Sequence, residues 1–137
     1  MTFAWWQRTL LFIALLTAGA TLTELLLLEH FEEWQQVIPI VLLVLAAGSI
    51  ILLLITSARW AVLLLRVVLT VCFVSALLGI WFHYQANVEF VLERHPNLTG
   101  FALFKEAAMG AMPSLAPGAM AQLALMGWLA TWTRRSA

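Results

Sequence analysis

Between two long apolar runs the chain reads Thr23-Glu24-Leu25-Leu26-Leu27-Leu28-Glu29-His30-Phe31-Glu32-Glu33-Trp34-Gln35-Gln36. This stretch holds four of the seven acidic residues and one of the three histidines in a chain of 137 residues. It is the densest group of possible ligands in the sequence, and it separates one apolar run from the next. We therefore expect two apolar segments joined by a short polar connection over residues 29–36.

The composition is that of a protein whose solvent is lipid. Hydrophobic residues make up 64% of the chain and charged residues 10%, with a mean hydropathy of +0.97. Soluble domains carry about 25% charged residues and about 45–50% apolar ones. A chain of this size cannot bury so much apolar surface in one core, so we predict an integral membrane protein. The net charge of zero argues against nucleic acid as a partner.

Four apolar segments have about the length of 20 residues that a helix needs to cross a bilayer core. We predict an all-α membrane protein with four transmembrane helices packed as a bundle in a single domain, residues 1–137, with spans at about 9–28, 37–57, 61–83 and 115–133. Pro39 suits the first turn of the second span, and Ser114 and Pro117 suit the start of the fourth. A cleaved signal peptide is the competing interpretation of the first run. Because that run continues to about Leu28, we interpret it as an uncleaved helix.

The segment 84–114 is predicted to lie outside the lipid. No strong breaker precedes Pro96, so the pattern allows the third helix to continue past His83 through Glu93. Farther on, apolar residues share one face at helical spacing, and Lys105 and Glu106 lie beside them. That face consists of Phe101, Phe104, Ala108 and Met112. Such a pattern predicts a short amphipathic helix at the membrane interface, with a re-entrant segment over 97–114 as the alternative.

Charge and tryptophan positions predict the same orientation. Basic residues lie at both chain ends and in the second connection, which the positive-inside rule assigns to the cytoplasm, whereas the segments 29–36 and 84–114 face outward. The basic residues concerned are Arg8, Arg59, Arg66, Arg134 and Arg135. The tryptophans fall at the predicted span ends, as in aromatic belts; they are Trp5, Trp6, Trp34, Trp60, Trp81, Trp128 and Trp132. We predict a multi-pass protein of the plasma (inner) membrane with both termini cytoplasmic, and its Trp- and Leu-rich style suggests a bacterial source.

Small and polar residues indicate where helices pack, because lipid provides no hydrophobic drive between them. On the third span Cys72, Ser75 and Gly79 follow one stripe, and Gly127 offers a similar site on the fourth. The lone cysteine, Cys72, excludes an internal disulfide.

Glu24 is an intramembrane polar residue, about one turn inside the outer end of the first span. A carboxylate at that depth is costly and is a functional hypothesis by default. Two interpretations stay open: the carboxylate is hydrated near the surface or caps a neighbouring helix, or it is paired with His83 at the same outer level.

Histidine and glutamate spacing raises the possibility of a metal or haem site at the outer face. His30 and Glu33 are three residues apart, and Glu89 and Glu93 are four apart, so each pair shares a helix face. With His83 they could hold a divalent metal, or the two histidines could ligate haem. The ordinary explanation is a solvated acidic surface that helps to set topology. No cofactor is required by the sequence.

Our leading hypothesis is a small, non-catalytic subunit that packs against and stabilises a larger membrane complex. The chain shows no P-loop, CxxC pair, nucleophile elbow or dinucleotide fingerprint, so we do not expect an enzyme. Its expected partners are lipids and other membrane subunits or further copies of itself, with contacts through Phe101, Phe104, Met109 and Met112. An oligomeric channel or transporter for cations or protons, using Glu24 and His83, is the first alternative. A haem- or metal-binding membrane protein is the second.

Overall fold

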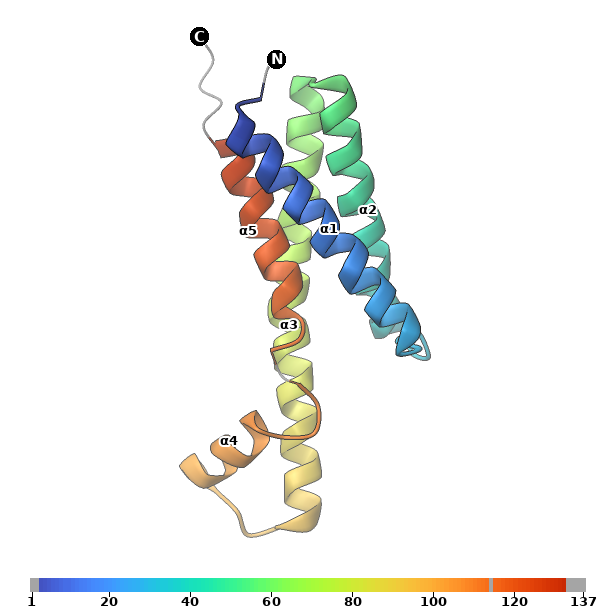
Figure 1. The fold of residues 1–137 in the computed structure, drawn as a ribbon. Helices are drawn as coiled ribbons and strands as arrows, with labels where there is room; N and C mark the ends of the chain where they lie inside the picture. The colour runs from blue at the N-terminus through green and yellow to red at the C-terminus, as the bar shows by residue number, and fades with distance from the viewer. Residues whose placement is uncertain (1–2, 114, 133–137) are drawn as a thin grey trace. The chain divides into compact units, whose positions relative to one another are not determined.

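The computed structural model describes residues 3–113 and 115–132, and every regular element in this part of the chain is a helix. The helices are α1 (Trp5–Leu27), α2 (Trp34–Thr56), α3 (Arg59–Arg94), α4 (Gly100–Ala108) and α5 (Gly118–Trp132) (Figure 1). By length and composition, α1, α2 and α3 can each cross a membrane. The prediction of an all-helical chain with several apolar spans is confirmed to this extent.

The second span begins one turn earlier than the sequence predicted. The side-chain oxygen of Gln36 accepts hydrogen bonds from the backbone N–H groups of Glu32 and Glu33, at 3.0 and 3.3 Å, and so satisfies donors at the start of α2. Pro39 consequently lies inside the helix rather than in its first turn. The helix ends at Thr56 because Ser57 adopts a left-handed conformation (φ 49°, ψ 24°).

The third helix is much longer than a bilayer core. Its 36 residues correspond to about 54 Å at 1.5 Å per residue, compared with a hydrocarbon core of about 30 Å. It ends at Arg94, immediately before His95 and Pro96. The proline ring disfavours helical geometry at the residue before it, which explains the end of the helix.

The last helix is shorter than the predicted fourth span. Residues 115–117 form a turn in which Gly118 N–H donates to the Leu115 carbonyl at 2.8 Å, so Pro117 precedes the helix instead of lying in its first turn. The 15 residues of α5 correspond to about 22 Å. The predicted N-cap Ser114 and the predicted span end at residue 133 lie outside the described residues.

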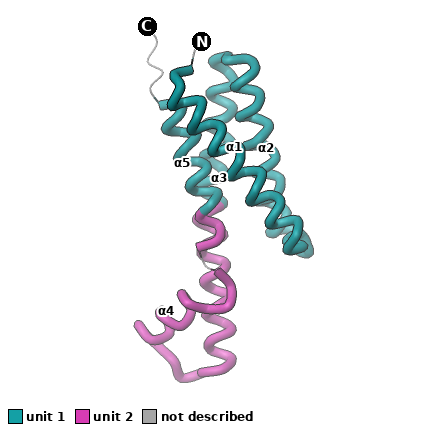
Figure 2. The backbone as a smooth tube through the Cα atoms, in the orientation of Figure 1, with its two compact units in different colours: residues 1–75, 119–137 teal, residues 76–118 magenta. Residues whose placement is uncertain are grey.

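The chain forms two compact units (Figure 2). Unit 1 comprises residues 1–75 and 119–137, and unit 2 comprises residues 76–118. In unit 1 each helix buries one stripe with the three- and four-residue spacing of a helix face. The stripes include Leu11, Ala14 and Ala18 of α1, Leu43, Ala46, Ile50 and Leu53 of α2, Leu65, Leu69 and Cys72 of α3, and Leu123, Ala124 and Ala130 of α5.

The other faces of these helices expose large apolar side chains. Phe12 and Leu16 on α1, Val41 and Val44 on α2 and Leu63 on α3 are all exposed. Exposing such a surface to water costs free energy, whereas exposing it to lipid does not. The distribution is therefore compatible with a multi-pass membrane protein.

Candidate functional site

The first group of predicted ligands lies in unit 1, around the connection between α1 and α2. Glu24 belongs to the last part of α1, and its side chain is exposed. His30 is half-buried within the turn that follows, and Glu33 is the exposed residue that directly precedes α2. The chain at Glu29 takes a left-handed conformation (φ 52°), which reverses its direction after α1.

The second group lies in unit 2, on the C-terminal half of α3. His83 is half-buried, whereas Glu89 and Glu93 are exposed. His30 and His83 thus belong to different units. Within residues 3–113 and 115–132, no group of three or more His, Cys, Asp or Glu side chains is arranged to hold a metal ion. The metal or haem site and the pairing of Glu24 with His83 stay predictions.

The predicted packing residues occupy close contacts in their own units. Cys72 is fully buried, and its Sγ lies 3.8 Å from the Leu42 carbonyl oxygen of α2. Ser75 is half-buried, one turn farther along α3. Gly127 of α5 faces Leu69, and a Cβ at this glycine would lie only 2.3 Å from Leu69 Cδ1. Because Gly127 has no side chain, the backbone of α5 can approach α3 closely, as expected for helices packed in lipid.

Two polar side chains converge on the last turn of α5 in unit 1. Arg66 Nη2 donates to the Thr131 carbonyl at 2.5 Å, and Arg66 Nε donates to Thr131 Oγ1 at 3.3 Å. From α1, Gln7 Nε2 donates to the Ala130 carbonyl at 2.8 Å. The last carbonyls of a helix have no partner within the helix. Here, a cation and an amide satisfy two of them, so the starts of α1 and α3 meet the end of α5.

In unit 2, Asn87 holds the loop that follows α4. Its Nδ2 donates to the Met112 carbonyl at 2.7 Å, and its Oδ1 accepts the Met112 N–H at 3.0 Å. Asn87 is 1% exposed, so water does not compete for these two bonds. A Cβ at Gly110 would lie 2.5 Å from Asn87 Cγ, so only glycine allows the loop to come this close. This contact was not predicted, because one asparagine in a helix and a distant glycine form no recognisable motif.

A second close approach fixes the chain after that loop. A Cβ at Gly79 would lie 3.0 Å from two ring carbons of Pro117, so the segment before α5 packs directly on this turn of α3. Together with the buried Ala107 and Val91, these contacts make residues 76–118 a compact helical hairpin.

A row of aromatic rings runs across this hairpin. Neighbouring ring centroids lie 6.2 Å apart for Trp81 and Tyr84, 5.9 Å for Tyr84 and Phe104, and 6.1 Å for Phe101 and Phe104. These separations fall in the range of favourable tilted aromatic pairs. The row leaves much of its surface open: Phe101 is 79% exposed, and Met109, after the end of α4, is 76% exposed.

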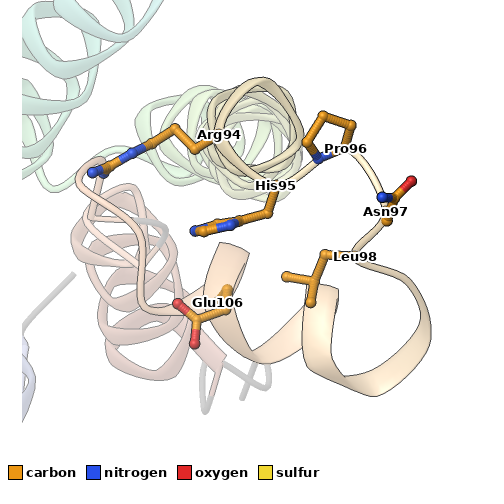
Figure 3. A pocket seen from close by; sticks show the side chains of 6 residues that line it. All are labelled: Arg94, His95, Pro96, Asn97, Leu98 and Glu106. Carbon is orange, nitrogen blue, oxygen red and sulfur yellow. The ribbon is translucent and has the colours of Figure 1, made fainter.

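An open hollow of about 560 Å³ lies at the far end of α3. It is lined by Arg94, His95, Pro96, Asn97, Leu98 and Glu106. His95, just after α3, and Glu106, from α4, point into the same hollow (Figure 3). All of its lining side chains except Leu98 are exposed, so its polar groups are available to water.

Comparison of the chain with protein-family models, curated proteins and solved structures found no match.

Proposed function

We propose that the protein is a small, non-catalytic subunit of the inner membrane that packs against a larger membrane complex. The observation that carries the proposal is the exposed apolar surface of unit 2, formed by Phe101, Phe104, Met109 and Met112. These side chains belong to a segment that Asn87 and Gly110 hold in place. A contiguous apolar surface marks a contact with a protein or a membrane. A fixed backbone lowers the entropic cost of such a contact, and methionine adapts to an irregular partner surface.

The proposal includes four spans with both termini in the cytoplasm. Its support is the convergence of the starts of α1 and α3 on the end of α5, through Gln7 and Arg66. If the starts of α1 and α3 face the cytoplasm, as the basic residues suggest, the end of α5 faces it too. The 15 residues of α5 are shorter than a hydrocarbon core, and local thinning of the bilayer or the residues that flank the helix can accommodate the difference. Residues 84–113 of unit 2 then face outward, with α4 lying along the outer membrane surface.

Native mass spectrometry of the protein extracted gently from its own membranes tests this function. A stoichiometric partner subunit is the expected result, and Phe101→Ser together with Met109→Ser should lower the fraction of protein in the complex. Both side chains are more than three-quarters exposed, so the yield should be preserved. The matched control is Leu63→Ser with Val67→Ser, two exposed residues of α3 in unit 1. A monomer or a self-oligomer without a partner would overturn the subunit proposal.

A further inference from the structure

Unit 2 contains an apolar groove of about 530 Å³. Its walls come from three segments: the middle of α3, one face of α4, and the turn before α5. The lining residues are Leu77, Ile80, Trp81, Tyr84, Phe104, Ala108 and Leu115. The four residues from α3 follow the spacing of a single helix face, so the groove runs along α3 for about two turns.

The groove lies where the apolar run of α3 ends. That run covers residues 61–82, with Arg66 as its one charged residue, and at 1.5 Å per residue it measures about 33 Å, close to the thickness of a bilayer core. Leu77, Ile80 and Trp81 are in its last two turns, and Tyr84 follows directly. Trp and Tyr prefer the boundary between hydrocarbon and headgroups. By position along the helix, the groove therefore lies at acyl-chain depth, in the leaflet that the proposed orientation makes the outer one.

The chemistry of the lining favours a hydrocarbon occupant. Among the described residues that line it, none is charged, and the polar side-chain atoms are the Tyr84 hydroxyl and the Trp81 indole N–H. Water would find too few partners here, and an unfilled groove would forfeit dispersion contacts along its walls. Next to Leu77 and Trp81 along the same helix, Leu78 and Phe82 also expose apolar side chains. A lipid chain can enter from that surface without crossing a polar barrier.

The walls are held independently of any occupant. The Asn87–Met112 hydrogen bonds fix the loop after α4, and the Gly79–Pro117 approach fixes the turn that contains Leu115. The Tyr84–Phe104 ring contact links α3 to α4. A preformed apolar groove binds with a smaller ordering cost than one that must assemble around its ligand.

We propose that this groove is a binding site for one acyl chain of a membrane lipid. The groove shares Phe104 with the proposed subunit contact but has a different occupant, because its other lining residues are not part of that contact and its apolar walls match hydrocarbon. An apolar segment of another protein is the competing occupant, and the experiment separates the two.

The test reconstitutes the full chain in phosphatidylcholine vesicles that contain a phospholipid with a diazirine on one acyl chain. After irradiation, peptide mass spectrometry locates the labels. We expect labelling at residues 77–84 and 104–115 to exceed labelling of the exposed α2 face at Val41 and Val44. Ala108→Phe should lower labelling of the groove about tenfold, the effect expected when about two methylene groups lose their apolar contacts.

Matched variants separate filling of the groove from the general effect of adding a large side chain. Ala102→Phe adds the same ring to an exposed position of α4 that does not line the groove, and it should leave labelling unchanged. If Ala108→Phe fails to fold, Leu77→Trp replaces it, with the exposed neighbour Leu78→Trp as its control. Equal labelling of the groove and the α2 face would overturn the proposal. So would labelling that the filling variants do not reduce, or a co-purified protein that shields residues 77–84 in native membranes.

Discussion

At the scale of single residues, the strongest constraints come from glycines against which other groups pack. Gly127 is one, because a Cβ there would overlap Leu69 Cδ1. Leu69 is fully buried, so its side chain must shift within the packed interior to make room for that Cβ. Overpacking a core typically costs about 1–3 kcal/mol. We therefore expect Gly127→Ala to lower the thermal unfolding temperature and the yield of folded protein in detergent.

Two comparisons isolate the packing effect at Gly127. Gly19→Ala and Gly48→Ala also replace a helical glycine, but a Cβ at either position meets nothing within 4 Å. These variants should be neutral or slightly stabilising, because alanine favours the helix. Adding Leu69→Ala to Gly127→Ala should recover part of the loss. Equal stability of the Gly127 and Gly19 variants would contradict the close packing of α5 on α3.

Asn87 is the second residue whose identity the structure explains. In Asn87→Asp the group that donated to the Met112 carbonyl becomes an acceptor, and a carboxylate is placed in a site that is 1% exposed. Losing a buried hydrogen bond and leaving its partner unsatisfied costs about 1–3 kcal/mol. We expect backbone hydrogen exchange at residues 109–113 to accelerate on the order of tenfold or more. Asn97→Asp, at an exposed position, should leave the exchange unchanged. Slow exchange in both variants would show that Asn87 does not hold the loop.

At the scale of elements, α5 is secured at its end by polar side chains as well as by packing. Arg66 donates to the Thr131 carbonyl, and a cation at a helix C-terminus also interacts favourably with the helix dipole. Arg66→Met should therefore lower the unfolding temperature, whereas Arg59→Met, at an exposed position, should not. The unfolding temperature of Arg66→Lys should lie between those of Arg66→Met and Arg59→Met, because lysine keeps the charge but loses the planar pair of donors. Thermal unfolding in one detergent compares all three. Equal unfolding temperatures for wild type and Arg66→Met would contradict the role of Arg66.

The helices also show which features of the fold periodicity and composition can predict. Runs of apolar residues were enough to predict helices near α1, α2 and α3, because each run is long and the only proline among them, Pro39, lies near the start of α2. The start of α2 was predicted late, because its first turn is polar and depends on the Gln36 side chain, which no hydropathy pattern reveals. The start of α5 was predicted early, because Pro117 fits a first helical turn equally well in the sequence. In the structure, Pro117 belongs to a turn and packs on Gly79 of α3. This is a tertiary contact, which the sequence pattern does not reveal.

The candidate site was predicted less well than the fold, for a related reason. Helical spacing is a local property, and it placed Phe101 and Phe104 on a helix correctly, whereas Met112 lies beyond the end of α4 at Ala108, in the loop that Asn87 holds. The Asn87–Met112 contact joins residues 25 positions apart, and neither residue is unusual in its own segment. The groove combines α3 with α4 and the turn at Leu115, so its existence depends on tertiary packing.

At the scale of the whole molecule, the orientation in the membrane decides which surfaces can meet which partners. Single cysteines introduced into a Cys72→Ala background test it, because Cys72 is the one native cysteine. The positions are Glu33, His95, Arg59 and Trp132, all exposed, so a label can reach each of them. The positive-inside rule and the acidic outer segments predict that Glu33→Cys and His95→Cys react with an impermeant maleimide on intact cells. Arg59→Cys should react only after permeabilisation.

Trp132→Cys decides whether α5 crosses the membrane. If it does, the end of α5 lies on the same side as Arg59, and this cysteine reacts only after permeabilisation. If α5 returns to the outer side, the cysteine reacts on intact cells, and the chain has three spans. The hydrogen bonds from Gln7 and Arg66 to the last turn of α5 favour the first outcome, because all three groups must then lie near the same membrane surface. Labelling of Arg59→Cys but not Glu33→Cys on intact cells would reverse the orientation and turn unit 2 toward the cytoplasm.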